Sequence, residues 1–130
     1  MNFPKELRYT ESHEWAKQDG DSLTVGITDY AQHELGDIVY VELPQKGKTI
    51  KKGEIFGAVE SVKAVSDLFA PVSGKIIEAN QELSAHPEYV NHDPYGKGWL
   101  IKIAPDNPNE INTIMDAAAY EKFVEEEAGK

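Results

Sequence analysis

The chain contains no cysteine, which excludes structural disulfides, cysteine-based zinc sites and thiol catalysis. It also has no run that approaches the ~18 consecutive apolar residues of a membrane span. Basic residues are scarce, because 13 Lys and Arg stand against 23 Asp and Glu, for a formal net charge of −10. That charge repels the phosphates of nucleic acids and the anionic surfaces of membranes. It favours instead protein partners with basic docking faces.

Other common kinds of site are missing too. The four histidines stand at spacings that match no zinc pattern. The glycines at Gly47, Gly53 and Gly57 precede no helix with Lys-Ser or Lys-Thr, which a phosphate-binding loop would require. The first residues form neither an apolar signal core nor an Arg-rich leader, so we expect a cytoplasmic protein.

Short β-rich runs separated by glycine and proline occupy most of the chain. Leu23, Val25 and Ile27 alternate with polar or small residues, and the run that precedes Pro44 is strongly β-forming. The expected strands are 8–10, 14–17, 23–27, 38–43, 55–61, 64–69, 74–78 and 99–103. We therefore expect a mainly β fold in which two small sheets fold over each other.

Helical signals are confined to short segments. Thr28 or Asp29 can cap a short helix over 30–35 that ends at Gly36, and 86–90 can form one helical turn. Near the C-terminus, Asn107 is a candidate N-cap and Asp116 can cap a further helix. At 130 residues the chain is the size of one domain. We expect a single domain over 1–130, with its core at about 20–104 and a C-terminal helical segment at about 107–127.

The most informative residue is Lys63. It lies between two Val- and Ala-rich arms, and Pro71 and Gly74 follow the second arm. A lysine held out on a hairpin offers its amine for covalent attachment of a cofactor, whereas most surface lysines are only solvated. The tip, 61–64, has no Asn-Gly or Asp-Gly pair, so propensity alone also fits one continuous strand.

The segment Glu60-Ser61-Val62-Lys63-Ala64 closely resembles the lipoyl-attachment motif of glycine cleavage system H proteins. A biotin-bearing domain would place methionine beside its lysine, and lipoyl domains of 2-oxoacid dehydrogenases usually carry Asp before it. Val62 departs from both patterns. Further segments resemble the H proteins in the expected order: Ser12-His13-Glu14-Trp15, Val25 to Ala31, Leu35-Gly36-Asp37, Val39 to Pro44, Gly47, Ala70 to Gly74, Asn91, Pro94-Tyr95 and Gly98-Trp99.

The resemblance implies a barrel-sandwich hybrid of the lipoyl/biotinyl type, with short peripheral and C-terminal helices. It implies that Lys63 becomes an amide of lipoic acid, and that a lipoate-attaching enzyme recognises the hairpin through Glu60, Ser61, Val62 and Ala64. The five-membered dithiolane ring holds its disulfide far from the preferred dihedral, which makes that disulfide easy to reduce. A flexible tether raises the local concentration of the group at each partner.

The resemblance also implies partners and a role. The glycine decarboxylase (P protein) loads an aminomethyl group, the T protein moves its carbon to tetrahydrofolate, and the L protein, a dihydrolipoyl dehydrogenase, reoxidises the dithiol. The chain would be the carrier between them and not an enzyme. An acidic cleft of Ser12, Glu14 and Asp67 would shelter the loaded amine. From the residues alone, Ser12 and Glu14 fit an exposed turn, and Asp67 fits a solvated strand position.

Two other functions remain open at this point. One is a related carrier that mainly passes lipoyl groups to other enzymes. The other is an acidic interaction module in which Lys63 stays unmodified.

Overall fold

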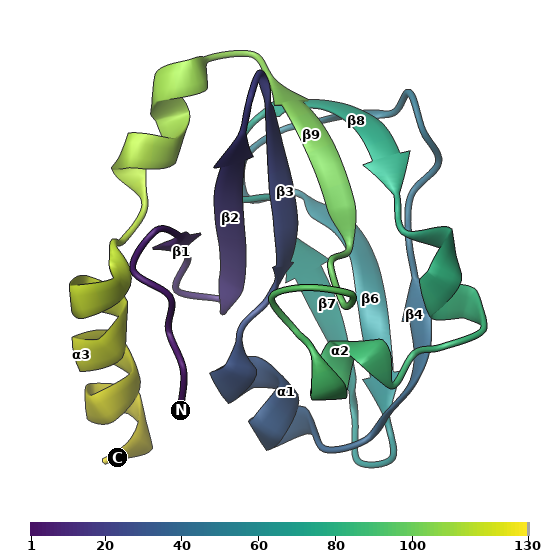
Figure 1. Ribbon diagram of the computed structural model, residues 1–130, viewed down its shortest axis with the longest axis vertical. Coiled ribbons are helices and arrows are strands. Elements are labelled where there is room, and N and C mark those ends of the chain that lie inside the picture. Colours follow the sequence, from purple (N-terminus) through teal and green to yellow (C-terminus); the bar gives the residue numbers. More distant parts are fainter. Residues whose placement is uncertain (130) are drawn as a thin grey trace.

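The computed structural model describes residues 1–129. Its strands, many of them with alternating apolar residues, form two antiparallel sheets (Figure 1). The first sheet has the order β1 (Arg8–Tyr9), β2 (Glu14–Asp19), β3 (Ser22–Ile27), β9 (Ile101–Pro105), β8 (Gly74–Ala79) and β5 (Thr49–Ile50). The second has the order β4 (Ile38–Glu42), β6 (Ile55–Ser61) and β7 (Val65–Phe69). The expectation of a mainly β fold with short helices is confirmed. Lys130, the last residue of the expected domain, lies outside the described residues.

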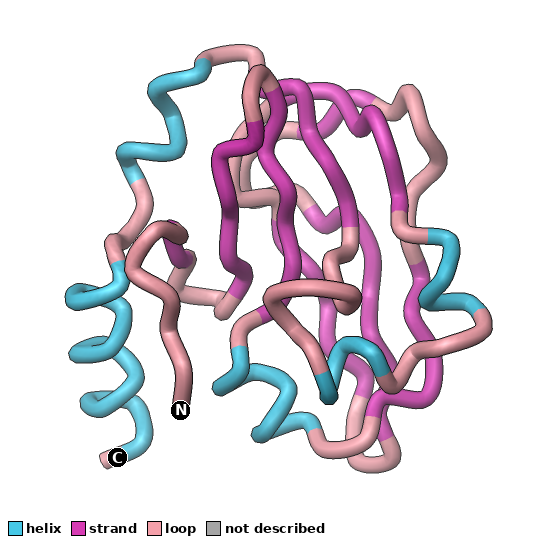
Figure 2. Tube along the Cα trace, in the orientation of Figure 1, coloured by secondary structure: helices cyan, strands magenta, loops and turns pink. Residues whose placement is uncertain are grey.

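Short helices connect and flank the sheets, as the colouring of Figure 2 shows. They are α1 (Asp29–Leu35), the 3₁₀ helix η1 (Gln81–Ser84), α2 (Tyr89–His92), the 3₁₀ helix η2 (Pro108–Thr113) and α3 (Ala117–Ala128). In Figure 1, α1 and α2 lie at the lower end of the molecule, beside the turn that joins β6 to β7. The C-terminal α3 lies on the other side, next to β1.

Both sheets bury side chains in the same core. Val25 and Ile76 come from the first sheet, Val59 and Leu68 come from the second, and all four belong to one buried cluster. Burial of such side chains contributes about 1.5–3 kcal/mol each to folding. The sheets are therefore held together as a sandwich, which places the β6–β7 hairpin on a rigid support.

A second buried cluster joins the two ends of the chain, outside 20–104. The rings of Tyr9 in β1 and Tyr120 in α3 stack with centroids 4.6 Å apart. The Tyr120 hydroxyl lies 2.7 Å from the Thr28 hydroxyl and 2.8 Å from Nδ1 of His13. Helix α3 is thereby attached to the segment that leads into α1.

Helix α1 begins and ends where the sequence predicts. Thr28 is its N-cap, because the Thr28 hydroxyl accepts a hydrogen bond from the Ala31 N–H at 3.2 Å. The helix ends at Gly36, whose φ of 79° and ψ of −159° suit glycine alone.

Two local predictions were wrong in their bounds. The helical turn expected at 86–90 lies at Tyr89–His92, because Pro87 precedes it and the residues before it form the unpredicted η1. The strand expected to begin at Trp99 begins at Ile101. Asn107 caps the segment after it as expected, and this segment forms the 3₁₀ helix η2, which buries only Ile111.

Candidate functional site

The tip of the β6–β7 hairpin is a tight turn that carries Lys63. The Ser61 N–H donates to the Ala64 carbonyl at 2.8 Å. The Ser61 hydroxyl accepts hydrogen bonds from the N–H groups of Lys63 and Ala64, each at 3.1 Å. Among residues 1–129 the only non-glycine residue with a positive φ is His13, so the turn forms without an Asn-Gly pair. Serine at the first turn position supplies the acceptor instead, which rules out the continuous strand.

The connection between α1 and β4 braces this turn. The Val62 N–H donates to the Asp37 carbonyl at 3.1 Å. The two residues on either side of Asp37 are held by Asn91 of α2. Its side-chain oxygen accepts from the Ile38 N–H at 2.8 Å, and its amide nitrogen donates to the Gly36 carbonyl at 2.8 Å. The tip is therefore fixed by contacts from parts of the chain far away in sequence.

The Lys63 side chain is exposed and its stem lies over Gly36. A Cβ atom at Gly36 would come within 3.4 Å of the Lys63 Cε, so the absent side chain makes room for the stem. Within residues 1–129, no hydrogen bond or ion pair engages the Lys63 ammonium group. An amine presented in this way is accessible to an acylating enzyme, so these residues fit a covalently attached group.

Strand β7 leads from the tip to a pocket. Asp67 and Phe69 are two residues apart on a strand, so their side chains lie on the same face. From Lys63 to Phe69 is at most about 20 Å, at roughly 3.3 Å per residue. Asp67 is exposed and does not line the pocket, whereas Phe69 does.

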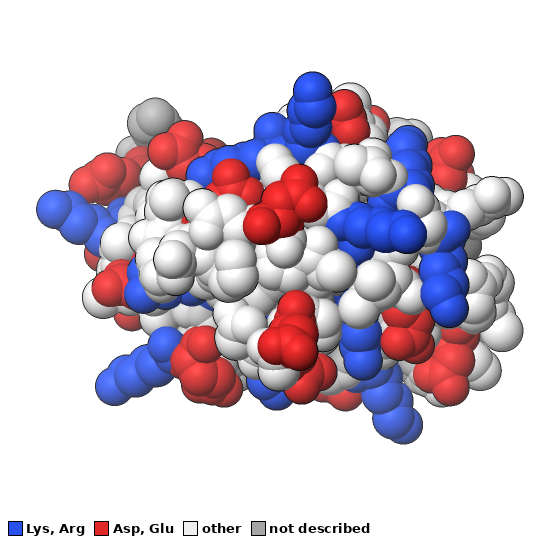
Figure 3. All heavy atoms as spheres, turned by 90° about the horizontal axis from the view of Figure 1, so that it is seen from above, with Lys and Arg blue, Asp and Glu red and all other residues white. Residues whose placement is uncertain are grey.

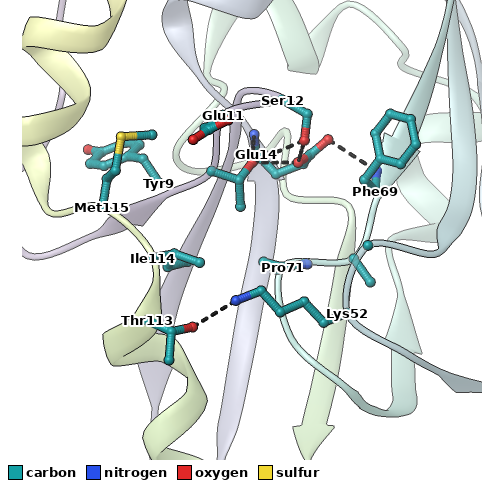
Figure 4. Close-up of a pocket in the computed structure, with 13 residues that line it drawn as sticks. Tyr9, Glu11, Ser12, Glu14, Lys52, Phe69, Pro71, Thr113, Ile114 and Met115 are labelled. Carbon is teal, nitrogen blue, oxygen red and sulfur yellow. Dashed lines mark hydrogen bonds between the residues drawn. The ribbon is translucent and has the colours of Figure 1, made fainter.

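The pocket has a volume of about 280 Å³ (Figure 4). It lies between the start of β2, the end of β7 and the segment before α3. Polar and apolar groups share its walls: Tyr9, Thr10, Glu11, Ser12, Glu14, Lys52, Gly53, Phe69, Ala70, Pro71, Thr113, Ile114 and Met115. Lys52 crosses one side and donates to the Thr113 hydroxyl at 2.8 Å. The pocket thus contains one lysine and two acids, Glu11 and Glu14.

Glu14 is the most unusual of these residues, because only 1% of it is exposed. One carboxylate oxygen accepts from the hydroxyls of Thr10 and Ser12 at 2.6 Å each, and the other accepts from the Phe69 N–H at 3.1 Å. The chain reaches this geometry through a turn in which His13 has a φ of 73°. Such a backbone is strained for most residues other than glycine and marks a fixed local shape.

Burial raises the pKa of Glu14 above its ordinary value, and the hydrogen bonds from Ser12, Thr10 and Phe69 oppose that rise. A buried carboxylate that is costly to ionise gains free energy when a cation enters its surroundings. The pocket therefore suits a small protonated amine.

The structure brings two of the three expected cleft residues together. Ser12 and Glu14 share the pocket and a hydrogen bond, so the interpretation of Glu14 as part of an exposed turn was wrong. Asp67 is exposed on β7, as its sequence context predicts. No local pattern in the sequence indicates the role of Thr10, the contacts of Asn91, or the hydrogen bond from the Phe69 N–H to Glu14.

The other residues of the lysine motif lie in and next to the turn that carries Lys63. Ser61 shapes the turn, while Val62 and Ala64 flank the lysine and are exposed. Glu60 pairs with Tyr40 on one side and Val65 on the other. Within residues 1–129 there is no cluster of three or more potential metal-ligating side chains, and no helix is long and apolar enough to cross a membrane.

Comparison with known proteins gives one family. The family model for the glycine cleavage H-protein matches residues 7–127. The glycine cleavage system H protein of Anaeromyxobacter sp. (strain K) is 59% identical over 127 residues, which is 98% of this chain and 99% of that protein. The H protein of Geobacillus sp. (strain WCH70) is 56% identical over 126 residues, 97% of this chain and 99% of that protein.

A solved structure agrees with the sequence relatives. The crystal structure of a glycine cleavage system H protein from Mycobacterium marinum superposes with a TM-score of 0.85 and 41% identity, covering 92% of this chain and 97% of that one. The chain therefore belongs to the glycine cleavage H-protein family, whose members are lipoate carriers and not enzymes.

Proposed function

We propose that the chain carries lipoic acid as an amide on Lys63 and shuttles the aminomethyl group of glycine from the P protein to the T protein. It then presents the dithiol to the L protein for reoxidation. The bound lipoyl group supplies a disulfide that accepts a carbon fragment and electrons. The chain acts as one carrier domain over 1–130, in the cytoplasm with these partners and the lipoate-attaching enzyme.

The observation that supports this proposal most strongly is the exposed amine of Lys63 on a braced turn. The turn is held by Ser61 from within and by Asp37 from outside. A rigid turn lowers the cost of presenting the lysine to several enzymes, because little backbone freedom is lost on binding. In this proposal Glu60, Ser61, Val62 and Ala64 are the residues through which the lysine hairpin is recognised.

Mass spectrometry of the protein from lipoate-fed cells tests the attachment. We expect a lipoyl-sized adduct on the parent and none on Lys63→Arg. Lys17→Arg is the matched control, because Lys17 is another exposed lysine next to a strand turn. An unmodified Lys63, under conditions that lipoylate other proteins, would favour an acidic interaction module instead.

A reconstituted glycine–bicarbonate exchange assay with the P protein tests the shuttle. Lipoylated parent protein should support exchange, and unmodified protein should not. Lipoylated protein that supports no exchange, but donates its lipoyl group to other enzymes, would favour a lipoyl-relay carrier.

The pocket is proposed to shelter the aminomethyl group during transit. The buried carboxylate of Glu14 is the counter-ion for its protonated amine, and the Ser12 hydroxyl holds that carboxylate in place. Asp67, on the face of β7 between the tip and the pocket, is an additional acid along the path. Exclusion of water from the pocket slows loss of the carbon unit.

Release of formaldehyde from the loaded protein measures this shelter. We expect Glu14→Ala to release it faster than the parent, and Ser12→Ala to have a smaller effect in the same direction. Glu11→Ala is the matched control, because Glu11 is an exposed acid at the rim without a hydrogen bond to Glu14. Equal rates in Glu14→Ala and the parent would contradict the role of the pocket.

A further inference from the structure

Exposed apolar side chains gather around the lysine turn. Among the described residues, six large apolar side chains are exposed, and four of them lie near the tip. These four are Val39, Tyr40, Val62 and Val65, which are 55%, 53%, 68% and 65% exposed. Contiguous apolar side chains on a soluble protein typically mark an interaction site.

The strand register explains why residues distant in sequence meet here. Tyr40 of β4 pairs with Glu60 of β6, and Glu60 pairs with Val65 of β7. Directly paired residues point to the same side of a sheet, so the three side chains form one row. The register shift in β4 between Ile38 and Tyr40 leaves Val39 as an extra residue next to this row. We call Val39, Tyr40, Glu60, Val62 and Val65 the tip face.

Apart from Lys63 itself, the charged residues around the tip face are all acidic. In 34–42 and 55–69, the acidic residues are Glu34, Asp37, Glu42, Glu60 and Asp67, and Lys63 is the single lysine or arginine. The opposite end of the molecule differs, because basic side chains are frequent there among acidic ones (Figure 3). The tip face therefore complements a surface that has an apolar hollow bordered by Lys or Arg.

Among the enzymes that meet this hairpin, one must work at the lysine itself. Attachment joins the Lys63 Nζ to the lipoyl carboxyl, which a nucleoside triphosphate first activates as an acyl nucleotide with release of pyrophosphate. The amine displaces the nucleotide and loses a proton. The other partners act at the far end of the attached group. Only the attaching enzyme therefore needs close contact with the side chains that surround Lys63.

We propose, building on the function proposed above, that the lipoate-attaching enzyme recognises the tip face through β4 as well as the hairpin. Tyr40 and Val39 fill an apolar hollow on that enzyme, and Glu60 meets a basic group at its border. Recognition then depends on the folded pairing of β4 with β6, so that an unfolded copy of the lysine motif is a poor substrate.

The rate of lipoylation, followed by mass spectrometry with purified lipoate–protein ligase, lipoate and ATP, tests this proposal. Removing a central aromatic anchor should lower kcat/KM for Tyr40→Ser roughly five- to thirtyfold. Ile55→Ser is the matched control, because Ile55 is 48% exposed on β6 at the far end of the same hairpin. That variant should stay within about twofold of the parent, as surface substitutions away from a contact usually do.

Salt dependence and binding give independent measures. Raising the ionic strength should slow lipoylation of the parent, and Glu60→Gln should weaken that dependence. A competition experiment removes chemistry from the comparison. Lys63→Arg protein should inhibit lipoylation of the parent, and Lys63→Arg carrying Tyr40→Ser should inhibit it less at equal concentration. Matching thermal unfolding of all variants shows that the fold is retained.

The outcomes separate this inference from the proposed function. No adduct on parent Lys63 would overturn both. An adduct on Lys63 that forms as fast in Tyr40→Ser as in the parent would overturn only the role of the tip face. Equal slowing by Tyr40→Ser and Ile55→Ser would do the same. Normal attachment with slowed glycine exchange in Tyr40→Ser would assign the face to the P protein and overturn the choice of the attaching enzyme.

Discussion

The contacts of Asn91 predict that a residue without direct access to the lysine controls the shape of the tip. Asn91→Ala removes the acceptor of the Ile38 N–H and the donor to the Gly36 carbonyl. Ile38 is buried, so its N–H would be left without a partner, which costs about 1–3 kcal/mol. The bond to Gly36 adds about 0.5–1.5 kcal/mol. The sum is a loss of roughly 2–4 kcal/mol in the free energy of unfolding.

Thermal unfolding and amide hydrogen exchange measure the effect. At about 3–5 °C per kcal/mol for a chain of this size, Tm should fall by roughly 6–20 °C. The N–H of Val62 should exchange faster, because its acceptor Asp37 lies between the two residues that Asn91 holds. Asn112→Ala, at an exposed position of η2, is the matched control and should leave Tm unchanged. An unchanged exchange rate at Val62 in Asn91→Ala would refute the proposed coupling.

Three further substitutions test the pocket and the core. Burial raises the pKa of Glu14 above 4.5, so the native state holds this proton more tightly than the unfolded state. The parent should therefore lose stability relative to Glu14→Gln as pH rises from about 4.5 through the raised pKa, and a pH-independent difference in urea unfolding would contradict this. Gly26→Ala places Cβ 2.6 Å from the Trp15 ring, so overpacking should cost about 1–3 kcal/mol and shift Trp fluorescence, whereas an unchanged spectrum would argue against the clash. Tyr120→Phe removes the hydroxyl that pairs with both Thr28 and His13, so Thr28 keeps only its bond from the Ala31 N–H; it should cost about 1–3 kcal/mol in urea unfolding, and a loss under about 0.5 kcal/mol would show that the two side chains find other partners.

The elements that the sequence predicts well are those set by local patterns. The alternation of Leu23, Val25 and Ile27 identifies β3, because one face of a sheet is buried and the period is two. Thr28 and Gly36 set the bounds of α1, because a cap side chain and a positive φ each need particular residue types. Such signals act over a few residues and need no knowledge of the rest of the fold.

The pocket could not be predicted in the same way. Thr10, Ser12 and Glu14 form a polar stretch that is typical of an exposed turn, and nothing local distinguishes it from one. Glu14 is buried because β7 passes over it and supplies the Phe69 N–H from 55 residues away. The resemblance to H proteins indicated Ser12 and Glu14, whereas the physical reason for their placement comes from tertiary packing.

Strand β7 determines how the amine and the buried carboxylate are placed relative to each other. At one end it joins the turn that carries Lys63, and at the other its Phe69 N–H contacts Glu14. The Asp37 carbonyl holds the first end through Val62. A slip of one residue in the pairing of β7 with β6 would turn the Phe69 side chain to the opposite face and move its N–H away from the carboxylate. The buried side chains that fix this register therefore contribute to function without touching either group.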